Sequence, residues 1–208
     1  MSVLRSLDEI AGTIDAVVTP GRRTIVGITG APGVGKSTIA AQVVELLAPA
    51  AALLPMDGFH LPQATLVALG RRQRMGAPDT FNVDVFLETL TALREISGKR
   101  VRAPGFDRET EEPVPNAVDI SPEFSTVVVE GNYLLLDSGG WERAAPLLDV
   151  TFFVEAPDDI RLERLVARHI RYGKSEADAR AWALGPDQAN ATLIEATAAR
   201  ADHRITLG

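Results

Sequence analysis

Gly30-Ala31-Pro32-Gly33-Val34-Gly35-Lys36-Ser37 fits the pattern GxxxxGK[ST] without a gap. Glycines permit positive φ angles and a close backbone approach, so the N–H groups of such a loop can turn inward around an anion. In this pattern the lysine reaches the β- and γ-phosphates of a nucleoside triphosphate, and the hydroxyl ligates magnesium. The stretch therefore predicts an ATP–Mg²⁺ site at Gly30, Ala31, Pro32, Gly33, Val34, Gly35, Lys36, Ser37 and Thr38.

The alternative for this stretch is a chance glycine-rich turn, and the lysine usage argues against it. The chain contains three lysines, Lys36, Lys99 and Lys174, so a chance match is on the order of a few in a thousand. The context also fits the motif, because an apolar run at Thr24–Thr29 predicts a buried strand before the loop. Apolar residues after the loop predict a helix that ends at Pro49.

The rest of the chain continues this alternation of strands and helices. Further strands are expected at Ala51–Met56, Thr126–Val129, Val150–Val154 and His203–Leu207. Helices are expected at Val83–Ile96, Ile160–Tyr172 and Asp187–Arg200, and near the N-terminus, where Val3, Leu7, Ile10, Ile14 and Val17 recur at helical spacing. The pattern predicts an α/β fold with a parallel sheet covered by helices on both faces. Ligands of such sheets bind beyond the carboxyl ends of the strands.

The segments outside the sheet suggest how a single domain spanning residues 1–208 is organised. A substrate-side arm is expected at roughly residues 60–120, in which the proline- and charge-rich Arg100–Ile120 forms an extended arm or hairpin that turns near Arg108–Thr110. A lid is expected at roughly residues 160–185, with Ser175 and Asp178 starting a helix as a capping pair.

Composition excludes several functional classes. The chain has 208 residues, a net charge of −7 and no cysteine, which rules out disulfides, thiolate catalysis and cysteine-ligated metal sites. The acidic total argues against a nucleic-acid partner. No stretch is long and apolar enough to span a membrane, and no secretory signal is read, so the cytoplasm is the expected compartment. The oligomeric state stays open, and a homodimer is one option.

Two carboxylates follow predicted strands. Glu130 ends the apolar run Val127-Val128-Val129, where an acidic residue would face the magnesium shell, directly or through a bound water. Asp57 follows the second strand, where a carboxylate could orient an incoming hydroxyl and take its proton. The alternatives are an ordinary glutamate at a strand end and a turn aspartate favoured before Gly58.

Four arginines, Arg161, Arg164, Arg168 and Arg171, are spaced by three, four and three residues and form one stripe on a helix. Leu162, Leu165, Val166 and Ile170 are expected to face the core. The ordinary interpretation of such a stripe is a solvated face. In an acidic chain, however, this concentration favours a lid that brings charge to the triphosphate, with Arg164 and Arg168 as the chosen catalytic and ATP-binding residues.

The segments GAPGVGKST, MDGFH, VVVEGNYLLL and RLERLVARHIRYG stand in the order seen in small-molecule P-loop kinases. The chain from Thr24 onward resembles the superfamily of pantothenate kinase, uridine kinase and phosphoribulokinase. Its C-terminal stretch, GPDQANATLIEATAARAD, is similar to a bacterial branch named for nucleoside kinases or for a fructose transport system kinase. The resemblance implies a P-loop NTPase fold with five parallel strands in the order 2-3-1-4-5, and a catalytic base at Asp57. The motif around Asp57 departs from the aspartate and bulky aromatic pair of uridine kinases.

The predicted acceptor pocket is built on Asp57 together with His60, Phe106, Asp107 and Arg108, of which VRAPGFD resembles a substrate-side segment of the same kinases. A plain turn is the alternative for the last three residues. The three histidines share no metal-ligand spacing, and His169 is expected in the core. Arg71, Arg72 and Arg74 are expected in a solvated loop, and Asn190 is placed near the nucleotide base.

These features predict an ATP-dependent kinase that transfers the γ-phosphate to a hydroxyl of a small metabolite, such as a sugar, a nucleoside or a pantothenate-like alcohol. Lys36, Asp57, Arg164 and Arg168 are its expected catalytic residues, and Ser37 and Glu130 its expected metal ligands. The guanine-reading NKxD motif is absent from the sequence. The alternative is a regulatory NTPase that acts as a conformational switch, which needs a water-positioning group in place of an acceptor pocket.

Overall fold

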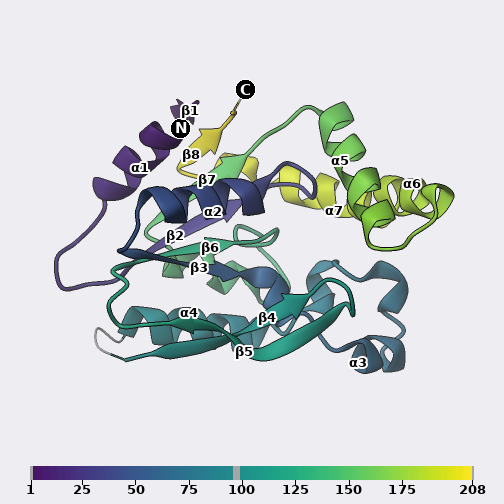
Figure 1. Cartoon of the computed structure of the whole chain (residues 1–208), viewed down its shortest axis with the longest axis horizontal. Helices are drawn as coiled ribbons and strands as arrows, with labels where there is room; N and C mark the ends of the chain where they lie inside the picture. The colour runs from purple at the N-terminus through teal and green to yellow at the C-terminus, as the bar shows by residue number, and fades with distance from the viewer. Residues whose placement is uncertain (1, 96–98, 208) are drawn as a thin grey trace.

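The computed structural model describes residues 2–95 and 99–207, and its centre is a parallel sheet (Figure 1). Six strands lie in the order β1-β8-β7-β2-β6-β3, and every pairing between them is parallel. Their bounds are β1 Ser2–Leu4, β2 Thr24–Thr29, β3 Ala51–Pro55, β6 Thr126–Glu130, β7 Val150–Val154 and β8 His203–Ile205. The five strands expected from the sequence are present, and their order 2-3-1-4-5 is confirmed.

The sixth strand corrects the expectation for the N-terminus. Val3 belongs to β1, which pairs with β8, and the helix α1 spans only Leu7–Asp15. Ser6 starts this helix because its backbone is extended and its side chain accepts a hydrogen bond from the Glu9 N–H. The helical spacing thus continues by coincidence through Val3, which is 45% exposed, and through Val17 beyond the last helical residue.

Helices cover both faces of the sheet, as predicted. One face packs on α1 and on α2, which spans Lys36–Leu46, through buried residues such as Ile10, Val43 and Phe152. The other face packs on α4, which spans Val83–Glu95, and on the segment around Trp141. The predicted end of α4 at Ile96 lies outside the described residues.

The hairpin expected at Arg100–Ile120 is present as β4 Val101–Asp107 and β5 Glu112–Ile120, which pair antiparallel. Its turn lies between the two strands and includes the predicted Arg108–Thr110. Residues 60–120 hold more than an arm, because α4 lies in this range and buries Phe86, Leu90 and Leu93 in the core. Four further α-helices of the described residues are α3 Gln63–Ala68, α5 Asp158–Arg171, α6 Glu176–Leu184 and α7 Pro186–Glu195, and a 3₁₀ turn at Met56–Phe59 follows β3. Short 3₁₀ turns also lie at Arg72–Arg74, Pro78–Thr80, Trp141–Arg143, Ala145–Leu147 and Ala198–Arg200.

The range of the predicted lid contains α5, a short connection and α6, which stand beside α7 at one end of the molecule (Figure 1). The Ser175 cap is confirmed, because its side chain accepts a hydrogen bond from the Asp178 N–H. Leu165 is buried as expected, but Ile170 is 44% exposed, and Leu162 and Val166 line a shallow apolar groove with α6. Leu162, Val166 and Ile170 therefore face the neighbouring helix α6 and not the core under the sheet.

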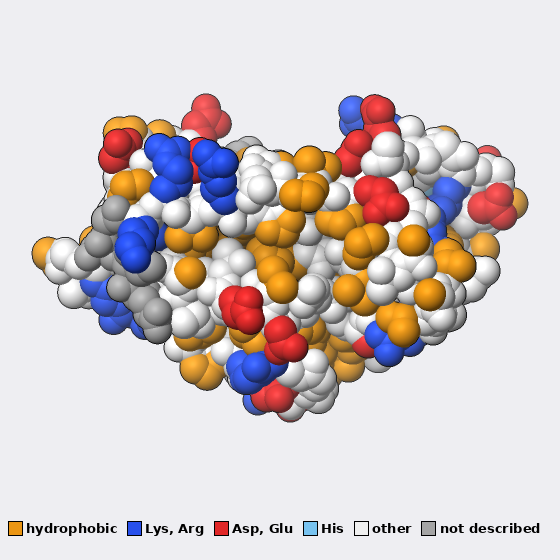
Figure 2. Space-filling view, turned by 90° about the horizontal axis from the view of Figure 1, so that it is seen from below, with side chains coloured by type: hydrophobic (Ala, Val, Ile, Leu, Met, Phe, Trp, Pro, Cys, Tyr) orange, Lys and Arg blue, Asp and Glu red, His pale blue; other side chains and the backbone are white. Residues whose placement is uncertain are grey.

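The surface agrees with the mixed composition. The face seen in Figure 2 has Lys and Arg side chains at both ends and at the lower edge, scattered acidic side chains and hydrophobic side chains across the middle, with no broad basic area. None of the helices in the described part of the chain is long and apolar enough to cross a membrane. The absence of a nucleic-acid partner stays a prediction.

Gly58 lies in the 3₁₀ turn after β3 and packs directly against the hairpin formed by β4 and β5. A Cβ on this glycine would lie 2.0 Å from the backbone oxygen of Pro104, a contact that no side-chain rotation can relieve. We expect Gly58→Ala to lower the free energy of unfolding by about 1–3 kcal/mol, in the range of an overpacked core. Urea unfolding followed by circular dichroism measures this.

The matched control is Gly12→Ala, because Gly12 lies inside α1 and a Cβ there meets no atom within 4 Å. This variant should be neutral or more stable by up to about 1 kcal/mol, since alanine has the higher helix propensity. Equal stability of the two variants would contradict the close approach at Gly58.

Candidate active site

The phosphate-binding loop connects β2 to α2 with the backbone conformation that its glycines predict. Gly33 and Gly35 have φ angles of +86° and +101°, which side chains of L-residues disfavour. A Cβ on Gly33 would also lie 2.6 Å from the backbone oxygen of Arg161, so α5 packs directly on the loop. The α2 helix begins at Lys36, and its N-terminal N–H groups and positive dipole end face the loop. The loop therefore has the backbone conformation and the helix N-terminus that the sequence motif predicts.

Lys36 is buried in the centre of the site, where its Nζ donates a hydrogen bond to the Ala31 carbonyl at 3.0 Å. Burial lowers the pKa of Lys36 to about 8, and the nearby carboxylates Glu130 and Asp57 oppose that shift. The hydrogen-bond partner of Lys36 Nζ is the neutral Ala31 carbonyl, and the phosphates of ATP would supply negatively charged partners.

Glu130 ends β6 next to the start of α2. The Ser37 hydroxyl donates a hydrogen bond to Glu130 Oε1 at 3.2 Å, so the two predicted metal ligands lie side by side. Burial, followed by the charge of Asp57, raises the pKa of the Glu130 carboxyl. The described residues hold no cluster of three acidic or histidine ligands that could bind a metal alone. This donor set fits Mg²⁺, which commonly takes one or two protein ligands and completes its shell with phosphate oxygens and water.

Asp57 stands in the 3₁₀ turn after β3, on the same edge of the sheet as Lys36 and Glu130. Its Oδ2 accepts a hydrogen bond from Arg108 at 2.7 Å, and its side chain is 27% exposed. Burial alone would raise the pKa of this carboxyl, but Arg108, with His60, Arg168 and Lys36, holds the pKa below its ordinary value. Asp57 is therefore ionised near neutral pH, with Oδ1 free of hydrogen bonds from the described residues.

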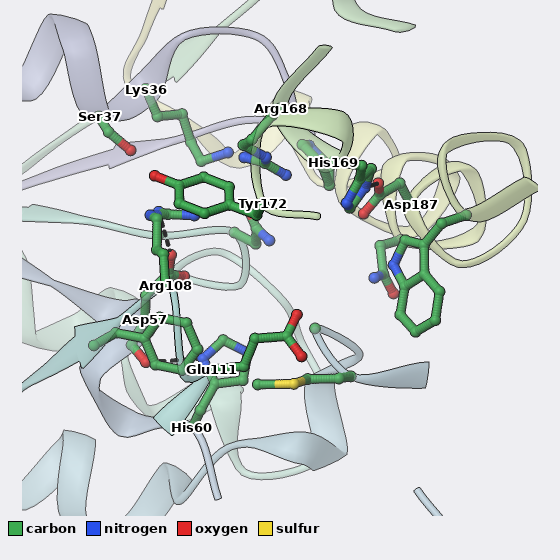
Figure 3. Close-up of a pocket in the computed structure, with 18 of the residues that line it drawn as sticks. Lys36, Ser37, Asp57, His60, Arg108, Glu111, Arg168, His169, Tyr172 and Asp187 are labelled. Atoms are coloured by element: carbon green, nitrogen blue, oxygen red, sulfur yellow. Dashed lines mark hydrogen bonds and ion pairs between the residues drawn. The ribbon is translucent and has the colours of Figure 1, made fainter. Parts of the chain in front are cut away.

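His60 and Phe106 lie beside Asp57, as the sequence suggests. The two rings are 4.8 Å apart between centroids, and His60 also stacks on Phe81 at 3.9 Å. His60 Nδ1 lies 2.8 Å from the Asp57 backbone oxygen. Burial lowers the pKa of the His60 imidazole. These rings form one wall of the pocket drawn in Figure 3.

Asp107 lies elsewhere. Its Oδ1 accepts hydrogen bonds from the Glu109 and Thr110 N–H groups in the hairpin turn, and the residue is not among those that line the pocket. Its part in substrate binding stays a prediction. The loop arginines are engaged with acidic partners, Arg71 and Arg74 with Asp79 and Arg72 with Glu111, and this occupies their charge.

The four arginines of α5 divide into different roles. Arg161 is 1% exposed and does not belong to a solvated stripe, because it donates hydrogen bonds to the Pro32 carbonyl, Asp158 and Gln188. Arg164 donates to the Val34 carbonyl at 3.3 Å, and Arg168 lines the pocket. Arg171 is exposed outside the pocket. Arg161 thus joins α5 to the loop, and lid movement of the remaining residues stays a prediction.

The wall opposite Asp57 comes from α5, α6 and α7, and most of it was not predicted. Its members are Arg168, His169, Tyr172, Lys174, Trp182, Asp187 and Asn190. His169 is not a core residue: its Nε2 lies 2.7 Å from Asp187 Oδ2, and both line the pocket (Figure 3). Asp187 and Asn190 are buried polar residues three apart on one helix. The spacing of three residues, which places Asp187 and Asn190 on one face of α7, was the available sequence signal for this wall.

Comparison with known proteins agrees with this geometry. The family model described as phosphoribulokinase / uridine kinase matches residues 25–202. The Escherichia coli K12 protein named "Uncharacterized protein YggC" is 38% identical over 184 residues, 85% of this chain and 75% of YggC. A pantothenate kinase of Leifsonia xyli is 34% identical over 139 residues, 64% of this chain and 43% of that enzyme.

Solved structures give the same result. The "putative fructose transport system kinase" of Silicibacter sp. TM1040 superposes with a TM-score of 0.89 at 35% identity, covering 97% of this chain and 99% of that one. The fold and the site define a P-loop kinase that phosphorylates a small molecule. The chain belongs to the phosphoribulokinase/uridine kinase family.

We expect Lys36→Ala to weaken ATP–Mg²⁺ binding by roughly 10- to 100-fold, because a charge-assisted hydrogen bond contributes about 1.5–3 kcal/mol. Isothermal titration calorimetry measures the affinity, and thermal unfolding shows whether the fold is retained. The matched control is Lys99→Ala, since Lys99 is exposed and outside the pocket. Equal ATP affinity of the Lys36→Ala variant and the wild type would show that the loop is not part of the ATP site.

Proposed function

We propose that this protein transfers the γ-phosphate of ATP to a hydroxyl of a small metabolite, such as a sugar, a nucleoside or a pantothenate-like alcohol. The observation that carries the proposal is the joint placement of Lys36 and Asp57. One pocket contains Lys36 of the phosphate loop and Asp57, whose Oδ1 has no hydrogen bond from the described residues. The rest of this pocket is open to an acceptor molecule. The family supports kinase activity on a small molecule, and the alcohol acceptor is inferred from the site.

In the proposed reaction, Asp57 Oδ1 accepts the hydrogen bond of the acceptor hydroxyl. Arg108 holds Oδ2 and keeps the carboxylate ionised, so Asp57 orients the hydroxyl and takes its proton as the bond to phosphorus forms. A carboxylate of lowered pKa is a weak base. This suits phosphoryl transfer, in which the hydroxyl loses its proton late, after most of the bond to the leaving oxygen has broken.

The loop and α5 would stabilise the charge of the transferring group. Lys36 would contact the β- and γ-phosphates, and Arg168 of α5 lines the same pocket as Lys36 and Asp57. Arg164 donates a hydrogen bond to the Val34 carbonyl in the loop. Ser37 and Glu130 would hold Mg²⁺, which neutralises part of the triphosphate charge.

A regulatory switch is the other candidate, and the pocket favours the kinase. A switch requires a group that positions water and loops that change partner, whereas Asp57 is held by Arg108 in a site walled by aromatic rings. The test is an ADP-release screen with ATP–Mg²⁺ across sugars, nucleosides, pantothenate and related alcohols. Acceptor-dependent ADP release supports the kinase, and ATP hydrolysis unaffected by every acceptor supports the switch.

We expect Asp57→Asn to reduce kcat for the acceptor found in that screen by roughly 10²- to 10⁴-fold, the usual contribution of a positioned base. ATP affinity should hold steady or rise slightly, because a negative charge near the triphosphate is removed. Coupled ADP release and nucleotide titration measure both quantities on one preparation.

The comparison variant is Asp107→Asn. The amide oxygen can still accept the two backbone hydrogen bonds of the hairpin turn, and Asp107 is outside the pocket. This variant should keep its turnover. Full activity of Asp57→Asn with loss of activity in Asp107→Asn would transfer the role of base to Asp107.

We expect Arg168→Ala to lower kcat by roughly 10²- to 10³-fold, as loss of one transition-state donor does, with a smaller change in ATP affinity. Arg171→Ala serves as the control on the same helix, because its side chain is exposed outside the pocket. Stopped-flow or coupled assays at saturating ATP separate the two effects. Equal turnover of Arg168→Ala and Arg171→Ala would show that the arginines of α5 only face solvent.

A further inference from the structure

The turn of the β4–β5 hairpin carries Arg108, the residue that pairs with Asp57. Arg108 Nη2 donates a hydrogen bond to Asp57 Oδ2 at 2.7 Å. Within the turn, Asp107 Oδ1 accepts hydrogen bonds from the Glu109 and Thr110 N–H groups, and the latter two residues are exposed. Exposed loops move more than the elements they connect unless other contacts hold them. The position of Arg108 therefore depends on what holds the turn.

Gln63, the first residue of α3, contacts this turn twice. Its side-chain Nε2 donates a hydrogen bond to the Thr110 carbonyl at 2.6 Å, and its backbone N–H donates to Glu112 Oε2 at 3.2 Å. Pro62 before it provides no side-chain cap for the helix, so the Glu112 carboxylate supplies an acceptor for the first N–H group of α3. Gln63 thus binds the turn on both sides of Glu111.

Arg72 adds a second contact, from the 3₁₀ turn Arg72–Arg74. Its Nε donates a hydrogen bond to Gln63 Oε1 at 3.1 Å, which orients the Gln63 amide toward the hairpin, and its Nη2 forms an ion pair with Glu111. Glu111 has a φ angle of +53°, a left-handed conformation that L-residues disfavour. Such a conformation persists where the surrounding structure holds it, and the ion pair with Arg72 is a contact that does so.

Resting on the kinase function proposed above, we infer that Gln63 and Arg72 are positioning residues for phosphoryl transfer, because they hold the hairpin turn on α3 and so place Arg108 against the Asp57 carboxylate. Gln63 and Arg72 are not among the residues that line the pocket. Their effect on the reaction therefore passes through Arg108, and neither contacts the reacting groups.

The contact between α3 and the turn is tested without an assay of activity. Gln63→Met keeps the length of the side chain and removes its amide. Gln73→Met is the matched control, because Gln73 is exposed in the neighbouring 3₁₀ turn and outside the pocket. Hydrogen–deuterium exchange measured by mass spectrometry should become faster in peptides that contain the hairpin turn in Gln63→Met, and not in Gln73→Met. Equal exchange in the wild type and both variants overturns the inference.

Action through Arg108 is tested with a double-mutant cycle on kcat/KM for the acceptor found in the ADP-release screen. Gln63→Met should lower kcat/KM by roughly 2- to 10-fold, the effect of one lost hydrogen bond, and leave the Kd of ATP unchanged. In an Arg108→Met background the same change should have no further effect, because the group that it positions is absent. The same loss in both backgrounds overturns the inference.

Arg72→Met should behave like Gln63→Met in both backgrounds. Its control is Arg100→Met, which breaks an exposed ion pair with Asp119 at the other end of the same hairpin. This control should keep the kcat/KM of the wild type. Thermal unfolding of each variant shows whether the fold is retained. Equal kcat/KM of Arg72→Met and Arg100→Met overturns the role of Arg72.

The pH dependence of kcat/KM distinguishes positioning from a general loss of structure. Burial raises the pKa of the Asp57 carboxyl, and Arg108 contributes most among the charges that lower it. The titratable and charged groups that face Asp57 are Arg108, His60, Arg168, Lys36 and Glu130. A displaced Arg108 would raise the pKa of Asp57, so the acid limb of the profile should move to higher pH in Gln63→Met. Lower activity with an unchanged acid limb overturns the inference.

The outcomes separate this inference from the proposed function. Acceptor-dependent ADP release that is the same in the wild type, Gln63→Met and Arg72→Met overturns the inference and leaves the kinase intact. ATP hydrolysis that no acceptor changes contradicts the kinase and, with it, the positioning role.

Discussion

The parallel sheet brings charged side chains close together, because its neighbouring strands all end at the same edge. Lys36 and Asp57 follow β2 and β3, and Glu130 is the last residue of β6; these three strands are neighbours in the sheet and end at the same edge. Each group is costly to bury alone, and each lowers the cost for its opposite. The loop glycines and the contact at Gly58 allow the segments after the strands to approach closely, and the ion pair with Arg108 partly offsets the charge of Asp57.

The elements that carry this edge could be predicted from the sequence because each has a local signal. Continuous apolar runs identify β2, β6 and β7, and the phosphate loop has a residue pattern that little else satisfies. The position of Asp57 follows from the strand before it and from Gly58 after it. The extended arm or hairpin at Arg100–Ile120 was predicted from its proline- and charge-rich composition, but its pairing register was not.

The opposite wall could not be predicted because its contacts join distant helices. Arg161 looked like its neighbours in the stripe, yet only tertiary packing reveals that it is buried between the loop and α7. His169 has the same difficulty, since its partner Asp187 lies eighteen residues further along the chain. The strand β1 was missed because an edge strand of three residues leaves little periodicity to detect, and the chance spacing of Val3 matched a helix.

The buried guanidinium of Arg161 has a thermodynamic consequence. It bridges the Pro32 carbonyl in the nucleotide loop and Gln188 on α7, the helix that also carries Asn190. In the proposed reaction this bridge would link the loop that binds ATP to the wall of the pocket that faces the acceptor, so each ligand would alter the affinity for the other. By linkage, the factor by which ATP alters the equilibrium affinity for the acceptor equals the factor by which the acceptor alters the affinity for ATP. The order in which the two ligands arrive leaves that coupling free energy unchanged.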